Sequence, residues 1–148
     1  MYYKILQPCS GDYPEVPASQ MSGTYQSAYG GRHTWEPGVT YGPVPVDPCR
    51  SGFHACRLQD LTLWAEPGMV VFEVELTDVV ETTDKVVGST AKLGRCLGHI
   101  TRDTFDRLYR DYEDPFGWQT FTGSMNPGGV VAAREARGRL LLSLLVTP

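Results

Sequence analysis

The most regular alternation of apolar and polar residues runs from Met69 to Leu76. Successive side chains of an extended chain point to opposite faces, which divides this segment into two sets. One set is apolar and the other carries two carboxylates: Val70, Phe72, Val74 and Leu76 against Val71, Glu73 and Glu75. This pattern predicts a strand with one face on the core and the other facing solvent or a cleft.

Two other segments have apolar residues at helical spacing. The first runs from Leu58 to Glu66 and is ended by Pro67-Gly68. The second runs from Thr101 to Glu113, where Thr101 is a suitable N-cap and the apolar residues form one stripe. We expect two amphipathic helices.

Shorter extended segments are predicted around a turn. Residues 32–35 form a candidate strand, and Glu36-Pro37-Gly38 has the proline and glycine positions typical of a β-turn. The chain would continue extended through Val39–Tyr41, and Thr90–Leu97 is a further expected strand.

The remaining segments carry weaker patterns. Thr82–Gly88 is interpreted as a loop, and a helix is expected from Val130 to about Arg137. From Arg139 onwards, both further helix and a buried strand fit the apolar pattern. Residues 8–48 are rich in Pro, Gly and Tyr and are predicted to form an irregular N-terminal segment.

These elements predict one α+β domain over residues 1–148. The expected architecture is a small, twisted, largely antiparallel sheet with two or three packed helices, because the chain has no βαβ repeat. The length suffices to bury roughly two thirds of the surface that the unfolded chain exposes.

Composition narrows the function classes. The chain has 17 acidic and 13 basic residues, a net charge of −4 that argues against a general nucleic-acid binder. Its small basic cluster, Arg134, Arg137 and Arg139, is interpreted as a solvated helix face. The longest apolar stretch, Leu140–Val146, is too short to span a membrane. With no signal-like N-terminus, we expect a cytoplasmic protein with reduced thiols.

The richest concentration of reactive side chains is Cys49–Cys56. Together with a second segment it offers five possible zinc donors: Cys49, His54, Cys56, Cys96 and His99. The spacing lacks the paired Cys-x2-Cys knuckles of structural zinc sites, so buried free cysteines are the alternative interpretation.

A second constellation combines imidazole, aromatic and carboxylate groups: His33, Trp35, Phe53 and His54 with Glu73 or Glu75. The two aromatic residues are candidates for holding a flat ring. The histidines and glutamates are candidate catalytic groups, since a carboxylate stabilises a developing cation or activates a hydroxyl. The alternative is that the aromatics are core residues and the glutamates are solvated.

Within Gly52–Cys56 we expect a backbone conformation at Gly52 that a Cβ would disfavour. Strand alternation then places Phe53 and Ala55 toward the core and His54 and Cys56 toward the cleft.

The middle of the chain resembles a small domain of unknown function found mostly in phage and bacterial genomes. Four segments carry the resemblance: Trp35–Tyr41, Ser51–Cys56, Val71–Glu75 and Thr83–Val87. It implies a phage or bacterial origin and no particular activity.

A second resemblance is to ADP-ribosyltransferases, particularly the small enzymes that modify rifamycins. Tyr29–Gly38 looks like their first strand and turn, and Leu58–Glu66 and Val71–Leu76 look like a helix and the central strand after it. His33 lies near the position of the first catalytic histidine. The chain departs from the family in having no matching ring-stacking tyrosine and no matching late carboxylate.

This second resemblance implies an ADP-ribosyltransferase-like fold and a cleft that binds NAD. The alternative is a non-enzymatic phage accessory protein, acting in the host cytoplasm or on the virion. It would engage a host or virion protein through its tyrosine-rich arm, Ser10–Tyr29.

Overall fold

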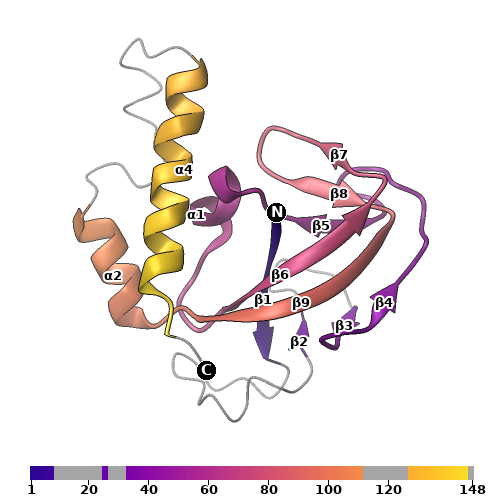
Figure 1. Cartoon of the computed structure of the whole chain (residues 1–148), viewed down its shortest axis with the longest axis horizontal. Coiled ribbons are helices and arrows are strands. Elements are labelled where there is room, and N and C mark those ends of the chain that lie inside the picture. The colour runs from indigo at the N-terminus through magenta and orange to yellow at the C-terminus, as the bar shows by residue number, and fades with distance from the viewer. Residues whose placement is uncertain (9–24, 27–32, 112–126, 147–148) are drawn as a thin grey trace.

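The computed structural model describes residues 1–8, 25–26, 33–111 and 127–146. This part of the chain forms a six-stranded and a three-stranded antiparallel sheet together with helices (Figure 1), so the predicted α+β class is confirmed. Most of the predicted irregular segment 8–48 lies outside the described residues. Its described parts include three two-residue strands: β2 (Tyr25–Gln26), β3 (Thr34–Trp35) and β4 (Thr40–Tyr41).

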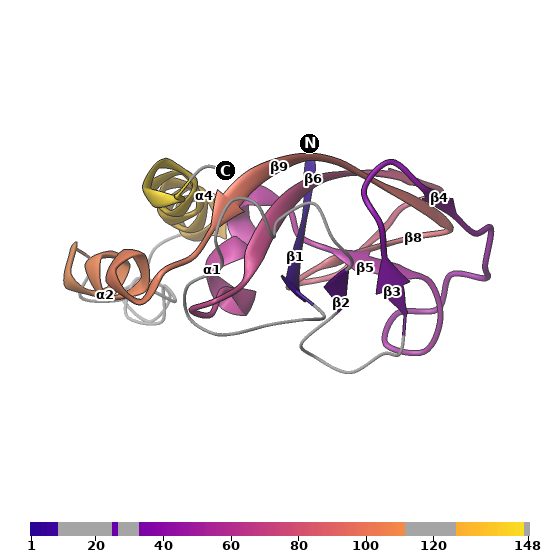
Figure 2. The ribbon, with the colours of Figure 1, turned by 90° about the horizontal axis from the view of Figure 1, so that it is seen from below.

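The larger sheet has the strand order β3-β2-β1-β6-β9-β4. Its centre consists of three longer strands: β1 (Tyr2–Pro8), β6 (Val70–Thr77) and β9 (Thr90–His99). The sheet is strongly curved (Figure 2), and its two edge strands, β3 and β4, follow each other in the chain across a short turn. Gly38 in that turn has φ +81°, as a glycine at the third turn position requires.

The smaller sheet has the order β5-β8-β7. Its strands are β5 (Phe53–Ala55), β7 (Val80–Glu81) and β8 (Val86–Gly88). The predicted loop 82–88 is therefore wrong at its end, because buried residues of β8 pair with both neighbouring strands. Only the turn before β8 is irregular, and there the Thr82 hydroxyl accepts the backbone N–H of Lys85 at 3.2 Å.

The helices gather on one side of the molecule (Figure 1). The predicted helix 58–66 is two short pieces, a 3-10 helix η2 (Leu58–Asp60) and α1 (Leu61–Trp64). Helix α2 (Arg102–Asp111) begins as predicted, since the Thr101 hydroxyl accepts the N–H of Thr104 at 3.0 Å. Helix α4 (Pro127–Leu144) is continuous. The segment from Arg139 onwards, for which both helix and strand fitted the pattern, is therefore helical as far as Leu144.

Helix α4 packs closely on η2, and this corrects one prediction. A Cβ on Gly138 would lie 2.2 Å from the carbonyl oxygen of Leu58, so only glycine permits this contact. Arg137, beside it, is buried, whereas Arg139 is exposed and lies 3.8 Å from Glu135. The three arginines therefore do not form one solvated face, because α4 is covered along this side.

Apolar clusters cover both faces of the larger sheet. Ile5 and Val71 are paired and belong to a cluster with residues of the helices, such as Leu141. Their neighbours Leu6 and Val70 are also paired and belong to a second cluster, on the other face. The expectation that the Val71 face of β6 is open was therefore wrong at Val71, where the helices cover the sheet.

Candidate functional site

A cavity of about 680 Å³ lies beside the edge of β1. Among the described residues, β2 pairs with β1 only at Gln7 and Pro8. Tyr3 exchanges two 2.8 Å backbone hydrogen bonds with Cys56, which follows β5. Between these pairings the edge at Lys4 and Ile5 borders the cavity, and the volume is within the range of small-molecule sites.

The wall of the cavity is basic. Lys4, Arg50 and Lys85 line it, and no carboxylate among the described residues does. The positive charge of Lys85 is partly balanced, because its Nζ lies 3.9 Å from Asp84 Oδ1 and 5.6 Å from the centroid of the Trp64 ring. Lys4 and Arg50 make no ion pair within the described part of the chain. The recess is thus positive in a protein of net charge −4.

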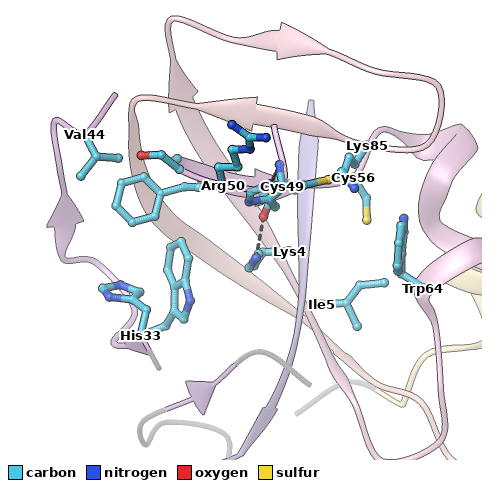
Figure 3. Close-up of a pocket in the computed structure, with 15 residues that line it drawn as sticks. Lys4, Ile5, His33, Val44, Cys49, Arg50, Cys56, Trp64 and Lys85 are labelled. Atoms are coloured by element: carbon cyan, nitrogen blue, oxygen red, sulfur yellow. Dashed lines mark hydrogen bonds between the residues drawn. The ribbon is translucent and has the colours of Figure 1, made fainter. Parts of the chain in front are cut away.

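Lys4 is the most unusual residue on this wall, because it is a lysine that is only 9% exposed. It pairs with Phe72 across β1 and β6, on the sheet face away from the helices. Its Nζ donates a hydrogen bond to the carbonyl oxygen of His54 (Figure 3) and lies 5.1 Å from the centroid of the Trp35 ring. Burial lowers the pKa of Lys4 to about 8, with the nearby Cys56 acting in the opposite direction.

Aromatic rings pack edge to face at one end of the cavity. The His33 ring centroid lies 4.8 Å from that of Trp35 and 4.3 Å from that of Tyr41, and Phe53 lies 5.5 Å from Trp35. Trp35 is buried, whereas His33 and Phe53 are half-buried. Burial, followed by the charge of Lys4, lowers the pKa of His33, so this imidazole is neutral near pH 7.

His54 organises the loop that precedes β5. Its Nε2 accepts the backbone N–H of Cys49 at 2.9 Å, which requires that nitrogen to be unprotonated. Burial, then the charges of Lys4 and Lys85, lowers the pKa of His54, consistent with a neutral ring. The ring therefore holds the loop closed, and its Nε2 is already engaged in that role.

Gly52 in the same loop has the conformation that was predicted. Its φ is +106°, and a Cβ there would lie 2.5 Å from Cγ1 of Val87 and 3.2 Å from the carbonyl oxygen of Gly88. The glycine thus permits both the left-handed backbone and the close approach of the loop to β8.

Four of the six predicted site residues line the cavity: His33, Trp35, Phe53 and His54. The two glutamates do not. Glu73 pairs with Tyr3 and lies 3.2 Å from Arg95, and Glu75 is exposed. They are on the sheet face opposite Lys4, since Lys4 pairs with Phe72 and strand neighbours alternate. The prediction that Glu73 or Glu75 lies in one cleft with the two histidines was therefore wrong.

The expected alternation along β5 holds only in part. Ala55 belongs to the cluster that includes Phe72, but Phe53 is half-buried and Cys56 belongs to the cluster on the helical face. All four residues from Phe53 to Cys56 border the cavity. Burial raises the pKa of Cys56 to about 12, so this thiol is protonated and unreactive at neutral pH.

The five possible zinc donors are not assembled. Cys49, Cys56 and Cys96 are free thiols in different environments: exposed, buried and half-buried. Within the ranges that the structure describes, no three His, Cys, Asp or Glu side chains come together in a way that would hold a metal ion.

Sequence reasoning missed Lys4 and Arg50, the cavity cations that make no ion pair with the residues described. Arg50 lies within the segment that was singled out, but it was not assigned a role. Lys4 carried a readable signal, because it is the one charged residue in the otherwise apolar and aromatic run Tyr2–Leu6. Its carbonyl partner belongs to His54, 50 residues further along the chain, and no local pattern predicts that contact.

Comparison with known proteins identifies no relative. The chain matches no protein-family model, and neither a curated protein nor a solved structure is significantly similar to it. None of the helices in the described ranges has the length and apolar character needed to cross a membrane.

Proposed function

We propose that the protein binds a small anionic molecule that carries a planar ring, with NAD as the representative of this ligand class. The observation that carries the proposal is the charge of the cavity wall. Lys4, Arg50 and Lys85 line it, and no described carboxylate does. Positive groups in a recess with low-dielectric walls focus the electrostatic potential and attract anions.

The aromatic side chains support the ring component of the ligand. His33 lies at one end of the cavity and Trp64 lies at the other (Figure 3). The rings of Trp35 and Phe53 pack beside His33, with centroids 4.8 Å and 5.6 Å from that of the imidazole. A dinucleotide such as NAD has a flat ring at each end and a diphosphate between them. The wall combines the matching features, because aromatic groups flank a region that contains Lys4 and Arg50.

The same wall favours binding over ADP-ribosyl transfer. That transfer develops positive charge on the ribose, which a neighbouring carboxylate stabilises and neighbouring cations oppose. Glu73 and Glu75, the predicted helpers, are outside the cavity. The proposal is therefore a binding function, with no catalytic step assigned to the histidines.

Isothermal titration calorimetry with NAD, ADP and nicotinamide tests this function. We expect heat from NAD and ADP, which carry phosphates, and much weaker binding of uncharged nicotinamide. Arg50→Ala should weaken ADP binding about tenfold, since a charge-assisted hydrogen bond contributes roughly 1.5 kcal/mol or more. Arg95→Ala is the matched control, because Arg95 is also an exposed arginine but does not line the cavity.

The absence of heat with both NAD and ADP at millimolar concentration would contradict the proposal. Equal losses of affinity in Arg50→Ala and Arg95→Ala would also contradict it, because the effect would then reflect the overall charge. Either result would favour the alternative of an accessory protein that engages a protein partner. The tyrosine-rich arm proposed for that role, Ser10–Tyr29, lies almost entirely outside the described residues.

A further inference from the structure

We infer that the side-chain amine of Lys4 is a covalent attachment point, which forms an imine with a planar aldehyde that carries an anionic group. The inference rests on the proposed anion-binding cavity for the entry of the ligand. It adds an activity to that cavity, namely reversible imine formation between Nζ of Lys4 and the carbonyl group of the ligand.

The geometry places the Lys4 side chain on the cavity wall and gives its Nζ defined neighbours. Lys4 is held on β1 by pairing with Phe72 of β6, and its Nζ donates to the carbonyl oxygen of His54. It also lies 5.1 Å from the centroid of the Trp35 ring. One N–H is therefore oriented by an acceptor, while the cavity borders the same side chain.

Within the described ranges, Lys4 has no neighbouring carboxylate of the kind that usually keeps a buried lysine charged. Lys4 makes no ion pair with the acidic side chains in the described ranges. Among the described residues, the titratable groups that act on it electrostatically are His33, His54 and Cys56, and none of these three is an anion at neutral pH. A buried amine without a counter-ion loses its proton more easily than one in water.

The lowered pKa of Lys4, about 8, agrees with this environment. About one molecule in five then carries the neutral amine at pH 7.4, against about one in a thousand for an ordinary lysine. Only the neutral amine has the lone pair that attacks a carbonyl carbon.

The reaction needs no oxidant, reductant or further co-reactant. The Nζ lone pair forms a bond to the carbonyl carbon, and the C=O π electrons move to the oxygen. A proton passes from nitrogen to that oxygen, which gives a carbinolamine. Loss of water then forms the C=N bond, so one amine and one aldehyde give one imine and one water.

Pyridoxal 5′-phosphate is a suitable probe, because it combines a ring, an aldehyde and a phosphate. The folded protein is incubated with a low concentration of the probe at pH 7.4 and reduced with borohydride, and the modified residues are located by mass spectrometry. The chain has three lysines, Lys4, Lys85 and Lys92. Cleavage after Tyr3 separates Lys4 from the amine of Met1.

We expect at least tenfold more modification at Lys4 than at Lys92, which is exposed and outside the cavity. Modification of Lys4 should increase with a midpoint near pH 8. Pyridoxal, which lacks the phosphate, should modify Lys4 more slowly. Lys4→Arg, which keeps the positive charge, should remove the imine absorbance, and Lys92→Arg should retain it.

Modification of Lys4 at or below the level of Lys92 in the folded wild-type protein would overturn the inference, without recourse to any variant. Different results would contradict the anion-binding site and imine formation at Lys4. ADP binding in calorimetry without modification of Lys4 would overturn imine formation alone. Rapid modification of Lys4 by both aldehydes, with no protection by ADP, would support imine formation and contradict the anion site.

Discussion

Two neighbouring residues of β1 lie in different environments on opposite faces of the sheet. Ile5 pairs with Val71 and joins a cluster of aliphatic side chains from the sheet and the helices. Lys4, one position earlier, faces the opposite side, where Trp35 and Phe72 lie and where a buried amine borders a cavity. The cavity lies at the edge of β1, but its charged and aromatic wall belongs mainly to this second face.

The difference indicates a division of roles between the two faces. The helical face buries apolar surface closely, as at Gly138, where α4 contacts the backbone of η2. The other face buries a cation that has no carboxylate partner among the described residues, an arrangement that costs free energy and is typical of functional sites. Changes on the helical face away from the cavity should therefore alter stability alone, and changes at residues that line the cavity should alter binding as well.

The largest expected effect is on the helical face. Leu141 is fully buried in α4, so Leu141→Ala should lower the free energy of unfolding by about 2–5 kcal/mol. Urea denaturation followed by circular dichroism measures this loss. Calorimetry on the variant, at a temperature where it remains folded, should give unchanged ADP affinity. A clear fall in that affinity would show that the two faces are energetically coupled and would contradict the proposed division of roles between them.

A smaller effect is expected at the loop that borders the cavity. Gly52→Ala should cost roughly 1–3 kcal/mol, because it introduces a residue with φ near +106° and a Cβ 2.5 Å from Val87. Gly38→Ala is the matched control, since Gly38 also has a positive φ but a Cβ there would meet no atom within 4 Å. The urea midpoint should fall further for Gly52→Ala, and its ADP affinity should fall too. A larger loss for Gly38→Ala would show that backbone strain alone, and not the loop contact, determines the cost.

Much of the fold was predictable because long amphipathic segments carry their own signal. The strand β6, most of β9 and the start of α2 at Thr101 follow from periodicity and capping. The N-terminal strand β1 was not predicted, since Tyr2–Leu6 is a short run without alternation. Its position depends on pairing with residues of β6 that are about 70 positions away, and such pairing has no local pattern.

The candidate site was predictable to the extent that it is local. The loop and strand around Gly52–Cys56 do border the cavity, and the conformation of Gly52 follows from its sequence context. The expected position of Glu73 at the cavity was wrong because alternation gives two faces without saying which of them borders a cavity. Lys4 was missed because tertiary contacts to Trp35 and to the carbonyl of His54 create its environment.

The smallest predicted effect concerns the pH dependence of stability. The pKa of Lys4 falls from 10.5 to about 8 on folding, so the unfolded chain binds more protons between these values and stability rises with pH there. The pKa of Cys56 rises from 9.0 to about 12, and this opposes the increase as pH rises through 9. Between pH 7 and pH 9 the free energy of unfolding should therefore increase by about 1 kcal/mol. Lys4→Met, which replaces the amine with an apolar side chain of similar length, should abolish this increase in urea titrations. An equal increase in the variant would assign the pH dependence to another group and would remove the evidence that Lys4 is buried as a cation at a free-energy cost.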